Sequence, residues 1–261
     1  MKRGLDGPAR EGRVARIDFT SRRLFVDADL AGDALVPLDR AQANYLINVL
    51  RFRSGDAVLV FNGRQGEWRA RLEPAGRKDA TLRVGERTRP QPPASPLTYA
   101  FAPLKLARLD YMVQKAVEMG AGVLQPVLTQ HTQVARLNLD RVRANAIEAA
   151  EQCGVLAVPD IRPPLSLLSW LDARPPDRPL VFCDEDAAMT APVEALRAAP
   201  AGDPTVLIGP EGGFSDAERA TLLARPDIVR LSLGPRILRA DTAAVAALAL
   251  VQALLGDTTP R

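Results

Sequence analysis

The segment of residues 207–218, LIGPEGGFSDAE, places three glycines and a glutamate between an apolar run and what reads as the start of a helix. Glycine permits positive φ and lets a ligand approach the main chain closely. Ser215 and Glu218 have the spacing of a capping box, so we expect a helix to begin there. A strand, a glycine turn and a helix N-terminus together form a common cradle for anions and other ligands. A tight turn with a purely structural role is the alternative.

A second loop of similar design lies in residues 231–243, LSLGPRILRADTA. A strand runs into Gly234-Pro235, Arg236 and Arg239 follow, and a helix is expected to begin near Asp241-Thr242. The two arginines could bind an anionic group or be ordinary surface charges. The first loop lacks the Gly-Lys-Ser/Thr of a phosphate-binding Walker loop, and the chain contains no G-x-G-x-x-G. A nucleoside-triphosphate site and a conventional dinucleotide pocket are therefore disfavoured.

Strands and helices alternate along residues 97–261, which predicts an α/β domain with a mostly parallel sheet. Open α/β folds bind ligands at the carboxyl ends of their strands, and both loops follow expected strands. We therefore expect both loops at that edge of the sheet. The expected strands cover residues 97–103, 123–129, 179–185, 205–209 and 229–234, and the expected helices cover residues 106–120 and 138–154.

The first third of the chain has a different pattern, in which turn signals separate short β-type runs. This pattern predicts a small antiparallel barrel or sandwich. One helix is expected over residues 39–51, with Leu46, Val49 and Leu50 on a shared face. Four prolines in residues 87–96 stiffen the backbone, so we place a boundary between domains 1–90 and 91–261. The β-type runs are residues 14–19, 23–30, 56–62, 67–74 and 81–86.

The basic charge is concentrated at the front of the chain. Residues 1–90 hold 18 basic and 12 acidic side chains, whereas residues 91–261 hold 16 and 19. The first domain is therefore expected to face a polyanion, for which nucleic acid is the usual candidate. An ordinary arginine-rich surface is the alternative.

Several classes of protein are disfavoured by composition. Cys153 and Cys183 are the only cysteines, which fits a reducing compartment and leaves no thiol cluster for zinc or disulfides. His131 is the only histidine, so a histidine-based triad or multi-histidine metal site is not expected, and we expect no metal. The N-terminus lacks a signal-like apolar stretch, and the apolar tract of residues 243–255 is too short for a membrane span. We expect a cytoplasmic protein.

Taken in order, the two loops and four shorter segments resemble the RsmE family of SPOUT-class RNA methyltransferases. The resemblance implies methylation of N3 of a uridine in small-subunit (16S) ribosomal RNA, with S-adenosylmethionine as the cofactor. It also implies a PUA-like β-barrel, a SPOUT domain with a deep trefoil knot, and a homodimer. The four shorter segments are NVLRFRSGD (48–56), VQKAVEMG (113–120), EAAEQCG (148–154) and FCDE (182–185).

The resemblance also implies that the two loops hold the cofactor through their main chains, with the glycines making room for it. Phe182, Cys183 and Glu185 are expected to border the same pocket. The residues expected to bind the cofactor are Ile208, Gly209, Pro210, Glu211, Gly212 and Gly213 in the first loop, and Leu231, Ser232, Leu233, Gly234, Ile237 and Leu238 in the second.

Methylation of uridine N3 requires removal of the N3 proton and stabilisation of the resulting anion. Glu211 is the candidate base or partner of the base, although it could instead be a carboxylate that favours the N-terminus of the following helix. Arg236 and Arg239 are candidate clamps for the uracil anion or for phosphates. His131 is not expected at either loop, so we do not expect it to be the base.

Binding of ribosomal RNA or the small ribosomal subunit is expected to fall to the basic first domain. Its candidates lie near Phe25 and Phe52, and the second domain could extend the path. Val155, Ala157 and Thr129-Gln130-His131 depart from the family pattern and remove potential substrate-binding charge. The candidates for RNA contacts are Arg22, Arg23, Arg51 and Arg53 in the first domain, and Lys105 and Arg108 in the second.

Two other functions fit the same residues. One is a SPOUT methyltransferase that acts on a different RNA position or on transfer RNA. The other is a noncatalytic RNA-binding factor for ribosome assembly that has kept the fold. The glycines of both loops favour an occupied cofactor pocket, and therefore an enzyme.

Overall fold

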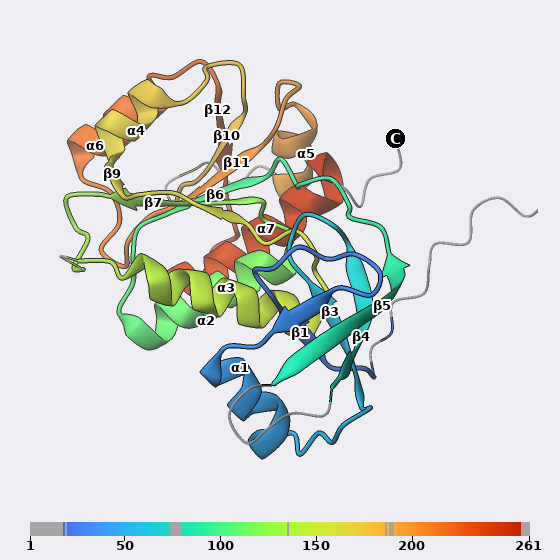
Figure 1. Cartoon of the computed structure of the whole chain (residues 1–261). Coiled ribbons are helices and arrows are strands. Elements are labelled where there is room, and N and C mark those ends of the chain that lie inside the picture. The colour runs from blue at the N-terminus through green and yellow to red at the C-terminus, as the bar shows by residue number, and fades with distance from the viewer. Residues whose placement is uncertain are drawn as a thin grey trace, which may run out of the picture. The chain divides into compact units, whose positions relative to one another are not determined.

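The computed structural model describes residues 18, 20–73, 80–134, 136–185, 187 and 191–256. The chain divides into two compact units, Met1–Pro90 and Gln91–Arg261. Figure 1 shows the short strands of the first unit and the larger sheet and helices of the second. No helix in the described ranges has both the length and the apolar character that crossing a membrane requires.

The first unit is built on one five-stranded sheet with the strand order β1-β3-β4-β5-β2. Neighbouring strands are antiparallel except for β1 and β3, which are parallel. The prediction of a purely antiparallel arrangement was wrong for this pair. Parallel neighbours need a long crossover rather than a hairpin, and residues 26–56 supply one that contains a helix. The strands are β1 Arg23–Phe25, β2 Leu35–Pro37, β3 Ala57–Phe61, β4 Glu67–Leu72 and β5 Thr81–Arg89.

The helix of the first unit changes type along its length. α1, Arg40–Asn44, is followed directly by a π-helical turn, Tyr45–Val49. The backbone N–H of Leu50 donates to the carbonyl oxygen of Tyr45, five residues back. This wider turn breaks the 3.6-residue period, so the predicted shared face was wrong: Leu46 is fully buried, whereas Val49 is 61% exposed.

The structure describes only part of the β-type runs predicted for the first domain. Apart from Asp18, the run of residues 14–19 lies outside the described residues, and so does the end of the run 67–74. Strand β2 has no predicted counterpart, because its three residues are too few to show a period.

The second unit contains a parallel sheet, as the alternation of elements predicted. Its strand order is β12-β10-β11-β6-β7-β8, with β9 also paired to β7, and every pairing is parallel. The strands are β6 Thr98–Phe101, β7 Val123–Leu128, β8 Asp160–Ile161, β9 Leu165–Ser166, β10 Leu180–Cys183, β11 Thr205–Ile208 and β12 Ile228–Leu231.

Helices cover both faces of this sheet (Figure 1). On one face, Trp170 of α4 and Leu222 of α6 belong to a buried cluster with Phe182 of β10 and Leu207 of β11. α2 packs against α3 and α7. The short helices α4 and α5 and the two-residue strands β8 and β9 were not predicted. The helices are α2 Leu106–Glu118, α3 Leu139–Cys153, α4 Leu167–Ala173, α5 Pro192–Arg197, α6 Asp216–Leu223 and α7 Ala240–Leu255.

Candidate functional site

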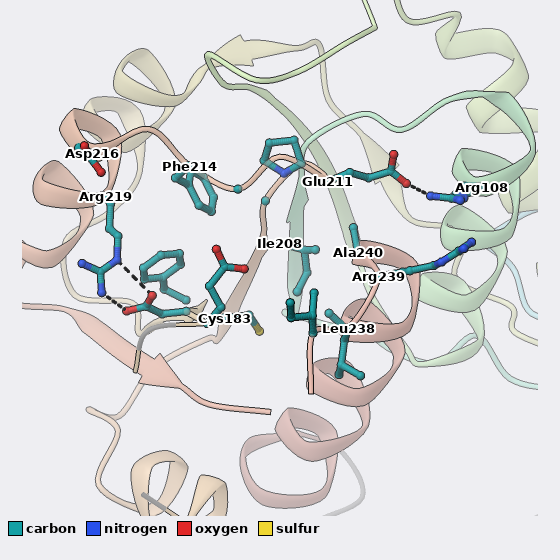
Figure 2. Close-up of a pocket in the computed structure, with 18 residues that line it drawn as sticks. Arg108, Cys183, Ile208, Glu211, Phe214, Asp216, Arg219, Leu238, Arg239 and Ala240 are labelled. Atoms are coloured by element: carbon teal, nitrogen blue, oxygen red, sulfur yellow. Dashed lines mark hydrogen bonds and ion pairs between the residues drawn. The ribbon is translucent and has the colours of Figure 1, made fainter. Parts of the chain in front are cut away.

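A cavity of about 510 Å³ lies where the loops after β10 and β11 meet the start of α7 (Figure 2). β10 and β11 are parallel neighbours, so their carboxyl ends lie at one edge of the sheet. The cavity volume is within the range of roughly 300–1,000 Å³ that is typical of small-molecule sites. The predicted residues that line it are Phe182, Cys183, Glu185, Ile208, Gly209, Pro210, Glu211, Gly213, Ile237, Leu238 and Arg239.

The second loop reaches the cavity only with its last part. Ile237, Leu238 and Arg239 line the cavity, whereas Leu231 is fully buried in the sheet and Ser232 is 7% exposed. The chain therefore leaves the sheet at the end of β12 and turns toward the cavity just before α7. Six predicted residues do not line this cavity: Gly212, Leu231, Ser232, Leu233, Gly234 and Arg236.

The glycines of the first loop serve the loop's own packing. A Cβ at Gly209 would lie 2.6 Å from the ring of Phe214, so only glycine lets that ring pack against the main chain. Gly213 has φ +70°, a conformation that glycine adopts without strain. Gly209 also lines the cavity, so the expectation that these glycines make room for a ligand stays a prediction.

The two helix N-termini beside the cavity differ in how they are capped. At α6, Ser215 accepts a hydrogen bond from the backbone N–H of Glu218, and the Glu218 carboxylate accepts one from the backbone N–H of Ser215. This is the predicted capping box. At α7, the N-cap Arg239 makes no side-chain capping bond, and Ala240 and Ala243 line the cavity. Asp241, in the first turn of α7, accepts a hydrogen bond from the backbone N–H of Thr242 at 2.9 Å, so each helix already carries a carboxylate at its N-terminus.

Glu211 forms an ion pair with Arg108, at the start of α2 (Figure 2). The Glu211 side chain is 40% exposed and that of Arg108 is 37% exposed. The expected alternative for Glu211 was a carboxylate favouring the following helix, but its partner is a guanidinium on a different helix. Arg108, expected as an RNA contact, is also part of the cavity wall.

His131 lies against the first loop. Its Nδ1 is 3.1 Å from the carbonyl oxygens of both Gly212 and Gly213. The expectation that His131 stands apart from both loops was therefore wrong. The turn after β7 is also held to α6, because the backbone N–H of Gln130 donates to Glu218 at 2.8 Å. The tertiary fold braces the loop after β11 with a turn from a distant part of the chain.

Asp184 is a cavity residue that the sequence did not single out. It follows β10, is 4% exposed, and accepts hydrogen bonds from Arg219 and Arg230 at 2.9–3.2 Å. Arg219, which is labelled in Figure 2, donates to this carboxylate from α6. Two guanidinium groups therefore stabilise one buried carboxylate beside the cavity. The acidic pair that ends the FCDE segment was the signal in the sequence that could have indicated Asp184. No sequence pattern predicts which arginines bind it.

Cys183, the neighbouring residue, is a thiol held neutral. Burial raises its pKa to about 12, because removal from water disfavours the thiolate. At neutral pH the thiol of this half-buried side chain is therefore protonated.

Comparison with known proteins identifies the family. A family model described as an RNA methyltransferase domain matches residues 90–252, and one described as an RNA methyltransferase PUA domain matches residues 38–85. The chain belongs to this RNA methyltransferase family. The combination of a PUA domain with a parallel-sheet methyltransferase domain is thereby confirmed. The resemblance to the RsmE family is confirmed by the following relatives, which are described as ribosomal RNA small subunit methyltransferase E.

Relatives of this RNA methyltransferase match most of its length. The "Ribosomal RNA small subunit methyltransferase E" of Rickettsia conorii is 29% identical over 90% of this chain and 96% of the relative. That of Synechocystis is 32% identical over 89% of this chain and 78% of the relative. The crystal structure of a Neisseria gonorrhoeae protein of the same description, bound to S-adenosyl methionine, has a TM-score of 0.80 and 28% identity. This structural match covers 92% of the present chain and 100% of the Neisseria gonorrhoeae chain.

In the PUA-containing unit of this methyltransferase, some of the arginines predicted to contact RNA are exposed and one is buried. Arg22, Arg51 and Arg53 are exposed, and in the second unit Lys105 is exposed as well. Arg23 is 6% exposed, and its Nε donates to the buried carboxylate of Glu67 at 2.8 Å. The prediction that Arg23 contacts RNA was therefore wrong, because its charge is consumed by a buried ion pair.

Proposed function

We propose that this chain transfers a methyl group from S-adenosylmethionine to N3 of a uridine in small-subunit (16S) ribosomal RNA. The observation that supports this most directly is the cavity built from the loops after β10 and β11 and the start of α7. The family of this chain, and the description of its relatives as small-subunit ribosomal RNA methyltransferases, agree with this function.

The residues present fit the cofactor. Ile208, Ile237 and Leu238 offer apolar contacts to a purine ring. Glu185 is a carboxylate that suits an ammonium group. The exposed fraction of Ile237 is 97%, which fits a side chain that a bound molecule or a partner subunit covers. The cavity thus offers apolar contacts for the purine ring and a carboxylate for the ammonium group.

Bound S-adenosylmethionine supplies a methyl group on a positively charged sulfur, so the transfer itself needs no metal. The chain must remove the N3 proton and stabilise the negative charge that spreads over the uracil ring. We assign proton removal, or orientation of the group that performs it, to Glu211. We assign stabilisation of the anion or a neighbouring phosphate to Arg239, which lines the cavity, and to the exposed Arg236.

The finer features implied by the family belong to the same proposal. We propose a trefoil knot around the two loops, a homodimer, a cytoplasmic location, and RNA binding by unit 1–90 with catalysis by unit 91–261. The dimer rests on the resemblance to the RsmE family, and the exposed side chain of Ile237 is available to a partner subunit. Arg22, Arg51 and Arg53 support RNA binding by the first unit.

Cofactor binding tests the first step of this proposal. Titration calorimetry of the full chain with S-adenosylmethionine should show binding, and Ala243→Phe, which fills the cavity from α7, should weaken it at least tenfold. Ala249 is exposed on the same helix and does not line the cavity, so Ala249→Phe is the matched control. Absence of binding by the wild-type chain would favour the noncatalytic ribosome-assembly factor.

The reaction is tested with small ribosomal subunits from cells that lack this protein. Incubation with radiolabelled S-adenosylmethionine should label the 16S RNA, and mass spectrometry of nuclease digests should identify N3-methyluridine. A different methylated nucleotide, or label in transfer RNA alone, would instead support the alternative SPOUT methyltransferase.

A further inference from the structure

Arg108 and Glu211 border two cavities of the second unit. Both line the cavity of about 510 Å³ described above, and both line another of about 730 Å³ beside the start of α2. Figure 2 shows Glu211 extending from its loop toward Arg108 on α2. The ion pair between them is therefore a wall that the two cavities share. The second cavity, here named the α2 groove, is lined by residues 104–109, Val134, residues 136–138, Arg141 and Glu211.

The α2 groove has an apolar surface. Leu104 and Leu109 are buried beneath it, and Leu106 is 66% exposed. Val134 and Leu137 contribute further apolar side chains from the segment before α3. A large apolar side chain exposed in a hollow, rather than alone on a convex surface, is typical of a binding surface.

Cations surround this apolar surface. Four basic side chains line the groove together with one carboxylate, that of Glu211. Arg141 is held by Asp110, with its Nε 3.0 Å from the carboxylate. Lys105 and Arg136 are exposed, and neither forms an ion pair within the described part of the chain. The groove therefore carries excess positive charge, which suits a polyanion.

An apolar surface with a cationic rim matches the base and the phosphate of a nucleotide. Enzymes that modify a base take it out of the stack and hold it between aromatic or apolar side chains. Lysine and arginine contacts to the phosphates position the strand but do not read its sequence. A protein segment would match the apolar surface, but it would not by itself account for Lys105 and Arg136, which have no ion-pair partner among the residues that the structure describes.

We propose that the α2 groove binds the nucleotide to be methylated and that its base reaches the cofactor cavity past the Arg108–Glu211 pair. This inference rests on the function proposed above. Both side chains of the pair are more than a third exposed, so water already competes for them and an incoming phosphate can replace Glu211 as the partner of Arg108. Opening the pair would turn the Glu211 carboxylate toward the base.

Matched leucine substitutions test the inference. Leu106→Glu adds a negative charge to the groove, whereas Leu168→Glu adds one on α4, at a leucine that is 54% exposed and lines neither cavity. Methyl transfer to small ribosomal subunits from cells lacking this protein is measured for both variants, with affinity for S-adenosylmethionine measured by calorimetry. Leu106→Glu should lower kcat/KM for the subunits at least tenfold and leave cofactor affinity within twofold. Leu168→Glu should leave both within twofold.

Salt dependence adds a measurement that does not require turnover. Lys105→Ala should reduce the slope of log affinity for the small subunit against log salt by about one, because one phosphate contact is lost. An unchanged slope in Lys105→Ala together with normal kcat/KM in Leu106→Glu would overturn the inference while leaving the proposed function intact.

Two other outcomes are distinguishable. If Leu106→Glu changes the mass of the protein in analytical ultracentrifugation, the groove is a contact between two copies of the chain, and the inference is overturned. If the wild-type chain methylates no RNA, the proposed function itself fails.

Discussion

Nδ1 of His131 lies 3.1 Å from the carbonyl oxygen of Gly212, which is 81 residues further along the chain. The same nitrogen lies 3.1 Å from the carbonyl oxygen of Gly213. A carbonyl oxygen only accepts hydrogen bonds, so this geometry requires the imidazole to carry a proton on Nδ1. We therefore assign His131 the role of a positioning residue for the loop after β11.

His131→Ala should weaken binding of S-adenosylmethionine, because the loop loses its brace. A net hydrogen bond contributes about 0.5–1.5 kcal/mol, which corresponds to roughly a 2- to 12-fold loss of affinity. His131→Asn, which retains a nearby N–H donor, should restore part of it. Gln130→Ala is the control, because Gln130 contacts Glu218 only through its backbone N–H. Calorimetric affinities that are equal in wild type and His131→Ala would contradict this role.

Arg236→Ala should lower turnover with little change in cofactor affinity, because Arg236 is exposed and does not line the cavity. A hydrogen bond to a charged group contributes about 1.5–3 kcal/mol, so kcat should fall roughly 10- to 150-fold. Arg239→Ala should lower both turnover and cofactor affinity, since Arg239 lines the cavity. Steady-state kinetics and calorimetry separate these outcomes. Equal losses of turnover and affinity in Arg236→Ala would show that this arginine shapes the pocket.

Cys183 should resist alkylation in the folded protein. With a pKa raised to about 12 by burial, its thiolate fraction at pH 8 is on the order of one in ten thousand. Iodoacetamide at pH 8 should therefore modify Cys183 at least tenfold more slowly than in the urea-unfolded chain. Mass spectrometry of the peptide that contains Cys183 measures both rates. Equal rates in the folded and unfolded chains would show an exposed, reactive thiol.

Glu67 should make the first unit sensitive to acid. Burial by itself raises the pKa of Glu67, but hydrogen bonds from Arg89, Thr88 and Arg23 outweigh it and hold the pKa below its ordinary value of 4.5. Because the folded pKa is the lower one, the stabilisation is fully present above pH 4.5 and is lost as the pH falls through the folded value. The free energy of unfolding should therefore drop in that range.

Glu67→Gln should cost about 3–5 kcal/mol at pH 7, because it leaves the buried Arg23 without its carboxylate. Urea unfolding measures this difference, which should shrink below pH 4.5. Glu86→Gln removes an exposed ion pair with Arg69 and should change stability by less than about 1 kcal/mol. A difference between wild type and Glu67→Gln that does not depend on pH would contradict the assigned role of the carboxylate.

Structural features that depend only on residues close together in the chain were predictable from the sequence. Asn138 caps α3 and Gly154 ends it in the left-handed conformation, as their positions around a helical period indicated. Ser215 and Glu218 form the predicted capping box. These features depend on residues three or four positions apart, so the local sequence specifies them. Val49 is the exception within this group, because it lies in a π-helical turn, which changes the period that the prediction assumed.

The sequence by itself determined that two glycine-containing loops follow parallel strands and that a helix begins after each, because capping and periodicity are short-range properties. Only the tertiary structure decided which side chains meet those loops. His131 with Gly212, Arg108 with Glu211, and Asp184 with Arg219 and Arg230 come from separate elements. Their contacts depend on the order in which the strands pair and on the paths of the connecting loops, and no local pattern of residues encodes either.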